Sequence, residues 1–144
     1  MSTFISYTDY ETRLSNRILT LLTEDNDYLL NNAESEAIGI ITNRLQDKYS
    51  IGAEFAKTGS ARNSSLIRWA LSIAIYTLYS RIPDEEVPER IIKDYDDTIS
   101  ELEKISQGKL SCTLTLNTDD EGETISRIRM GSNDPRTHDP FEYP

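Results

Sequence analysis

Apolar residues recur at helical spacing along most of the chain up to Gln107. A stripe at positions i, i+3 and i+4 marks the buried face of an amphipathic helix. Four such stretches predict four helices, from about Thr8 to Leu22, from Leu29 to Lys48, from Ser64 or Ser65 to Arg81, and from Pro88 to Gln107. Asn16 is a possible break within the first of them. The turn-forming residues between 50 and 65 predict a loop.

The second and third predicted helices carry most of the expected core. Ala33 and Ala37 lie on the apolar stripe of the second helix, and its polar residues are expected mostly off that stripe: Asn31, Glu34, Glu36, Asn43 and Gln46. Gly39 is costly inside a helix, so it marks either a close helix crossing or a tolerated weakness. The third helix is apolar on most sides, which predicts that it is the central one.

The fourth predicted helix has the clearest boundaries. Pro88 suits a first helical turn because the donor that proline lacks is unpaired there anyway, and Gly108 is a typical C-terminal stop. The aromatic residues of the third and fourth helices are expected to pack in the core or between subunits, and to be less suited to stacking on bases. They are Trp69, Tyr76, Tyr79 and Tyr95.

Beyond Gly108 the apolar period changes to two, with Leu110, Cys112, Leu114 and Leu116 alternating with polar residues. This alternation predicts a β-hairpin over residues 110–130. Residues 131–144 are rich in Pro, Asp and Asn and predict an extended arm. The expected organisation is therefore a helical domain over residues 1–109, followed by the hairpin and the arm.

The appended segment holds the residues that we expect to contact another protein. Its arginines alternate with apolar and aromatic side chains, and the open edge of a hairpin can add a strand to a neighbour. The candidate interface residues are Ile125, Arg127, Arg129, Arg136, His138, Phe141 and Tyr143. The alternative is that this segment is a loose C-terminal end that contacts no other protein.

Composition narrows the function classes. The chain has 144 residues and a formal net charge of -10, which disfavours gripping nucleic-acid phosphates and suits a surface that DNA passes without being held. Cys112 and His138 are the only residues of their types, so neither an internal disulfide nor a zinc site is expected, and a reducing compartment is favoured. No secretory signal is recognised at the N-terminus, and the apolar run 66–79 is too short to span a bilayer.

Candidate chemistry is sparse. No nucleophile with a base and no set of metal ligands can be named, so neither an enzyme nor a cofactor is expected. The acidic residues Asp94, Asp96, Asp97 and Glu101 are better explained as a solvated helix face than as a cation site. The run 119–123 departs from the spacing of a calcium loop and is better explained as an acidic turn.

The order and spacing of several motifs resemble the head-to-tail connector proteins of tailed bacteriophages, of the type found in Mu-like prophages. The resemblance covers most of residues 3–111, and each motif also has a plain folding role. The motifs are Tyr7-Thr8-Asp9, Ala33 and Ala37 followed by Leu45 and Tyr49, Phe55, the run from Ile75 to Pro83, Val87-Pro88-Glu89-Arg90, Tyr95, and the run from Ile105 to Ser111.

The resemblance implies a mainly α-helical fold: an antiparallel four-helix connector-type domain with a C-terminal β-hairpin and an extended arm appended. It also implies a virion protein, made in the host cytoplasm, that forms a ring, commonly dodecameric. Such a ring docks under the portal protein, extends the DNA channel and offers a platform to the next connector or tail protein.

A second class of function fits the same size and charge. An acidic phage protein could act as a decoy that binds a basic host DNA-processing protein. Against this, the acidic residues form no continuous phosphate-like track, and the apolar third helix with an aromatic arm suits a symmetric assembly better.

Overall fold

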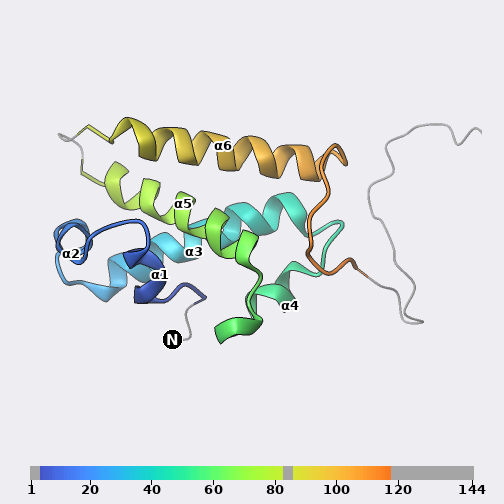
Figure 1. Ribbon diagram of the computed structural model, residues 1–144, viewed down its shortest axis with the longest axis horizontal. Coiled ribbons are helices and arrows are strands. Elements are labelled where there is room, and N and C mark those ends of the chain that lie inside the picture. Colours follow the sequence, from blue (N-terminus) through green and yellow to red (C-terminus); the bar gives the residue numbers. More distant parts are fainter. Residues whose placement is uncertain (1–3, 83–85, 118–144) are drawn as a thin grey trace, which may run out of the picture.

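The computed structural model describes residues 4–82 and 86–117 (Figure 1). This part of the chain is mainly helical. Its elements are α1 (Tyr7–Glu11), α2 (Asn16–Thr23), α3 (Asp27–Leu45), α4 (Ile51–Phe55), a 3-10 turn η1 (Gly59–Ala61), α5 (Ser64–Ser80) and α6 (Glu89–Ser106).

Three long helices make the body of the molecule. In Figure 1, α3 and α6 run in the same direction along the long axis, and α5 runs against them and packs on both. The short helices α1 and α2 lie near the start of α3, and α4 lies near its end. The predicted antiparallel four-helix arrangement is not confirmed, because the expected first helix is short and divided.

The central position predicted for the third helix is confirmed. Helix α5 is buried at Leu66, at every residue from Trp69 to Ile75, and at Leu78. Ala70 and Ala74 are fully inaccessible to solvent, as are Ala37 and Ile41 of α3. Small side chains let helices approach closely, and the larger apolar side chains around them remove apolar surface from water at about 25 cal/mol per Å².

The helix ends follow local hydrogen-bonding rules. Ser6 and Asp9 form a capping box that starts α1. Asn63 caps α5 by accepting from the backbone N–H groups of Ser65 and Leu66 at 2.9 and 3.1 Å. The residues Ser64 and Ser65 suit a helix cap, but the cap of this helix is the asparagine that precedes them. An amide oxygen fills the same role as a hydroxyl.

Gly108 ends α6, as predicted. Its φ of +79° is a left-handed conformation that glycine adopts without strain. The N–H groups of Gly108 and Lys109 donate to the carbonyls of Ile105 and Lys104 at 3.1 and 2.8 Å. These two bonds form a Schellman motif and turn the chain away from the helix axis.

The expected first helix is two helices, α1 and α2. Between them the Thr12 hydroxyl donates to the carbonyl of Asp9 at 2.6 Å, and Ser15 caps α2 by accepting from Ile18 N–H at 3.3 Å. Hydroxyl side chains that bond to nearby backbone groups compete with helix continuation. The break therefore begins before Asn16, and the predicted loop over 50–65 also contains α4 and η1.

Residues 110–117 do not form a hairpin strand. Leu116 makes an isolated antiparallel bridge with Tyr49, which lies between α3 and α4. Leu114 is buried, whereas Leu110 and Leu116 are 41% and 37% exposed. The alternating apolar residues thus do not share one buried face, since the segment packs across the end of the bundle. The second half of the predicted hairpin and the arm, residues 118–144, lie outside the described residues.

Gly39 is not at a close helix crossing. It is exposed on α3, and a Cβ placed on it would meet no other atom within 4 Å. The alternative, a tolerated weakness in the helix, fits this position.

Candidate assembly interface

The described C-terminal segment is held against the connection between α3 and α4. Ser50 N–H donates to the carbonyl of Thr115 at 2.8 Å, and Asn117 N–H donates to the carbonyl of Lys48 at 3.0 Å. The Asn117 amide also donates to the carbonyls of Gln46 and Asp47 at 3.0 and 3.1 Å. These bonds fix the point from which the chain continues toward the predicted interface residues.

Glu54, which lies on α4, holds the same C-terminal segment through its side chain. The residue is 2% exposed, its carboxylate accepts from Thr115 N–H at 2.9 Å, and it lies 3.0 Å from the Lys57 ammonium. Burial opposes ionisation, but the hydrogen bonds from Thr115 and the Lys57 ion pair outweigh it and lower the pKa of Glu54. A buried carboxylate therefore joins α4 to the C-terminal segment.

Cys112 and Tyr49 form the inner side of this contact. Cys112 is half-buried against the core, and Tyr49 is buried. Burial, together with the neighbouring Cys112 thiol, raises the pKa of Tyr49 to about 12. The Tyr49 side chain is therefore a neutral packing group near pH 7.

The four aromatic residues singled out in the sequence fall into two environments. Trp69 is 1% exposed and belongs to the core. Tyr76, Tyr79 and Tyr95 are half-buried and pack against the core edge. The rings of Tyr76 and Tyr95 are stacked, with centroids 4.1 Å apart, and so join α5 to α6. The residues of the predicted hairpin and arm that were expected to form the interface, from Ile125 to Tyr143, lie outside the described residues.

A groove of about 300 Å³ opens beside the stacked tyrosines. Its walls come from α3, α5 and α6 and include Leu29, Ala33, Glu36, Ile40, Tyr76 and Tyr95. The groove is mostly apolar, and Glu36 and Arg81 are the charged residues that line it. It is a shallow surface feature.

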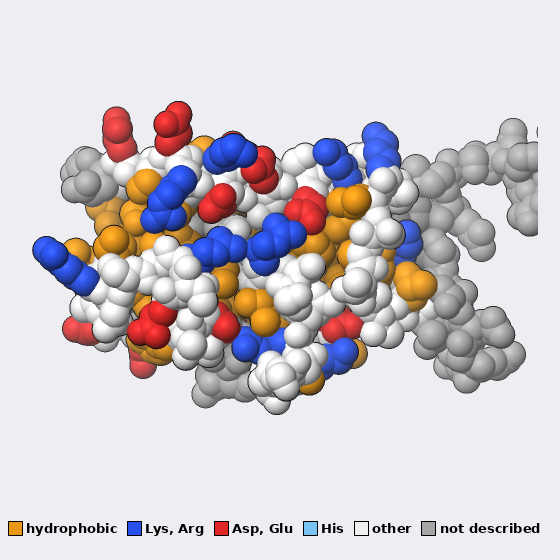
Figure 2. Space-filling view, in the orientation of Figure 1, with side chains coloured by type: hydrophobic (Ala, Val, Ile, Leu, Met, Phe, Trp, Pro, Cys, Tyr) orange, Lys and Arg blue, Asp and Glu red, His pale blue; other side chains and the backbone are white. Residues whose placement is uncertain are grey.

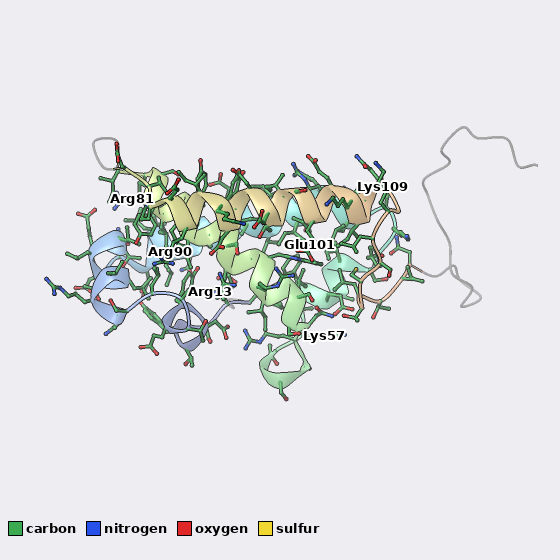
Figure 3. All side chains as sticks on the ribbon, turned by 45° about the horizontal axis from the view of Figure 1, so that its top comes forward. Arg13, Lys57, Arg81, Arg90, Glu101 and Lys109 are labelled. Carbon is green, nitrogen blue, oxygen red and sulfur yellow. The ribbon has the colours of Figure 1, made fainter. Side chains whose placement is uncertain are left out.

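Two acidic residues of α6 pair with arginines from other elements, and Figure 2 shows Lys and Arg side chains across the middle of that face. Arg68 donates to both oxygens of Glu101 at 3.2 and 3.0 Å. Arg13 lies 3.8 Å from Asp94, and Figure 3 shows Arg13 and Glu101 on this same side of the molecule. The face is thus a mixed ion-pair surface, more neutral than the sequence alone indicated.

The N-terminal segment is held by two residues that the sequence did not identify. The buried Glu34 carboxylate accepts from the backbone N–H groups of Phe4 and Ile5, and burial raises its pKa more than these bonds lower it. Arg62 donates to the Phe4 carbonyl at 2.7 Å and to Asp9 at 2.6 Å. Burial opposes ionisation of Asp9, but the bonds from Arg62 and Ser6 prevail and lower its pKa.

The polar residues of α3 were expected to lie mostly off its apolar stripe, and Glu34 is an exception because it is buried. It follows Leu30 by four positions and precedes Ala37 by three, which is the spacing of the buried face. That spacing was the available signal. A charged residue on a buried stripe needs a partner, and here backbone N–H groups supply it.

The comparison with known proteins adds an identity to this geometry. The family model described as bacteriophage Mu, Gp36 matches residues 4–129. The chain belongs to the bacteriophage Mu Gp36 family. No curated protein and no solved structure is significantly similar to the chain.

Membership of the Mu Gp36 family makes the chain a Mu-like phage protein. The match extends past Asn117, so the family includes part of the segment after α6 that the resemblance did not cover. The region that matches the family therefore includes residues 118–129 together with the helical body.

Two further properties of this Mu Gp36 chain concern the described residues alone. No helix among them is both long and apolar enough to cross a bilayer. Within residues 4–82 and 86–117, no three His, Cys, Asp or Glu side chains are grouped so that they could hold a metal ion.

Proposed function

We propose that the chain is a structural subunit of the phage virion that assembles into a ring at the head-to-tail junction. The observation that carries this proposal is the match to the bacteriophage Mu Gp36 family over residues 4–129. The family assignment supports a structural role connected with the virion. The ring, its commonly dodecameric size and its position under the portal come from the resemblance to connector proteins.

The use of the buried titratable groups supports a structural role over a catalytic one. Asp9, Glu34 and Glu54 have shifted pKa values, and such groups often mark active sites. Here each of them bonds to backbone N–H groups of a chain segment that it holds in place. The pKa shifts of Glu34 and Glu54 arise where these residues hold the segments around Phe4 and Thr115, and the shift of Asp9 arises where it starts α1.

Charge supports the proposed relation to DNA. With a net charge of -10, the assembled ring would repel phosphates and leave the duplex free to move. The ion pairs on the α6 face count against the decoy alternative, because Arg13, Arg68 and Lys93 interrupt the acidic surface with positive charge. A phosphate mimic needs a continuous negative track.

Portal binding is the test. The purified full chain is mixed with the portal complex of the same phage and separated by size, with the portal of an unrelated phage as the control. The proposal expects comigration with its own portal only. If the chain fails to comigrate with the portal at low and at moderate salt, and binds a basic host protein tightly and in a salt-sensitive way, the decoy function would be favoured over the connector function.

A further inference from the structure

The exposed apolar side chains of the body gather at its two ends. Six large hydrophobic residues are exposed in the described part of the chain, and five of them lie at the start of α1 and α3, in the last turn of α2, or beyond the end of α6. At one end are Tyr7, Leu21 and Tyr28, and at the other are Leu110 and Leu116. Ile92 is the sixth.

Opposite charges surround these two groups. We call Tyr7, Leu21, Asp25, Asp27 and Tyr28 the acidic end, and the Tyr7 hydroxyl donates to Asp27 at 3.2 Å within it. Glu24 lies there as well and pairs with Arg81 at 2.8 Å, and the exposed Arg17, one helical turn before Leu21 on α2, reduces the negative charge here and does not cancel it. Asp25 and Asp27 form no ion pair within the described residues.

The basic end consists of Lys48, Lys104, Lys109, Leu110 and Leu116. The N–H groups of Lys109 and Leu110 donate to the Lys104 carbonyl. The N–H group of Asn117, the residue after Leu116, donates to the Lys48 carbonyl. None of these lysines is in an ion pair within residues 4–82 and 86–117. Asp47 and Glu103 reduce the positive charge here and do not cancel it.

The two ends face away from each other. Helix α3 begins at the acidic end and finishes next to Lys48, a separation of about 28 Å for its 19 residues. Figure 3 shows Lys109 at the opposite end of the molecule from Arg81, the partner of Glu24. Figure 2 shows Lys and Arg side chains over the C-terminal end of α6.

We propose that the acidic end of one subunit docks on the basic end of a second copy of the same chain, in a head-to-tail contact that repeats around the ring. A cyclic ring needs two different complementary surfaces on each subunit, and a subunit that carries both meets this need. Apolar side chains surrounded by complementary charge give such a contact both area and register. This inference rests on the proposed ring function and identifies the surfaces that build the ring.

Charge reversal tests the contact. Asp27→Lys replaces a negative charge with a positive one at the acidic end, and the double variant Lys104→Glu with Lys109→Glu does the reverse at the basic end. Each variant alone should weaken self-association by about tenfold or more. A 1:1 mixture should assemble again, because the reversed ends match each other and the native ends match each other around an alternating ring. Asp96→Lys, an equal charge change on the exposed middle of α6, should assemble like the native chain.

Assembly is measured as particle mass in solution, with and without the portal complex, and circular dichroism verifies that each variant is folded. Native-like assembly of both reversed variants would overturn the head-to-tail contact and leave the ring intact. So would failure of the mixture to assemble while the native chain does, since the charges would then act only on helix stability. A native chain that forms no oligomer, alone or on the portal, would overturn the ring function together with the contact.

Discussion

Glu54 gives the sharpest test of how the C-terminal segment is held. Its carboxylate makes a charged hydrogen bond with Thr115 N–H at 2.9 Å and an ion pair with Lys57 at 3.0 Å. A net hydrogen bond to a charged group contributes about 1.5–3 kcal/mol, whereas a pair with a lysine whose side chain is 42% exposed contributes about 0–1 kcal/mol. We expect Glu54→Ala to lower the free energy of unfolding by about 2–3 kcal/mol, most of it through Thr115.

The assay is urea denaturation combined with hydrogen exchange of individual amides. Glu54→Ala should strongly reduce the protection of the Thr115 amide, and Glu54→Gln should retain part of it because an acceptor oxygen remains. Lys57→Met is the matched control, because it removes the ion pair and leaves the Thr115 bond. Equal losses from Glu54→Ala and Lys57→Met, or an unchanged Thr115 amide, would refute the assignment of the anchor.

Three further predictions concern the body of the protein. Gly39→Ala should stabilise the protein by about 1 kcal/mol, or about 4 °C in Tm, because Gly39 is exposed inside a helix. Gly108→Ala should destabilise it, because the φ of Gly108 is +79°. Equal effects of the two substitutions would contradict this account. Tyr10→Phe should stabilise by about 1 kcal/mol in calorimetry, because the buried Tyr10 hydroxyl has no hydrogen-bond partner among the described residues, and a clear loss would refute this. The lowered pKa values of Asp9 and Glu54 stabilise the fold above their unfolded values of 3.8 and 4.5, and this stability is lost as the pH falls through the folded values. Asp9→Asn should therefore reduce the difference between urea midpoints at about pH 7 and about pH 3, and an unchanged difference would contradict the Arg62 pairing.

The three long helices could be predicted from the sequence because local signals define them. Each has a sustained apolar period, and Gly108 marks an end that needs no distant partner. The nearly uniform apolar character of residues 66–79 likewise predicted that α5 is the central helix. These signals act over a few residues, so a single sequence contains them in full.

The contacts that hold the segments around Phe4 and Thr115 could not be predicted in this way. Glu54 and Thr115 are 61 positions apart, and Glu34 and Phe4 are 30 apart, so neither partner is visible from the local pattern of the other. The alternation over residues 110–116 predicted a strand, but its partner proved to be the segment beside Tyr49. The alternation of apolar and polar residues does not identify the segment with which a strand pairs, or the surface that it covers.

Electron microscopy of the full chain mixed with the portal complex of its phage tests the connector proposal most directly. The account predicts a closed ring of subunits coaxial with the portal, lying under it and extending its channel, with the acidic end of each subunit against the basic end of the next. The account would be contradicted if a saturating concentration of the chain added no density to the portal, or if the added density lay away from the channel axis.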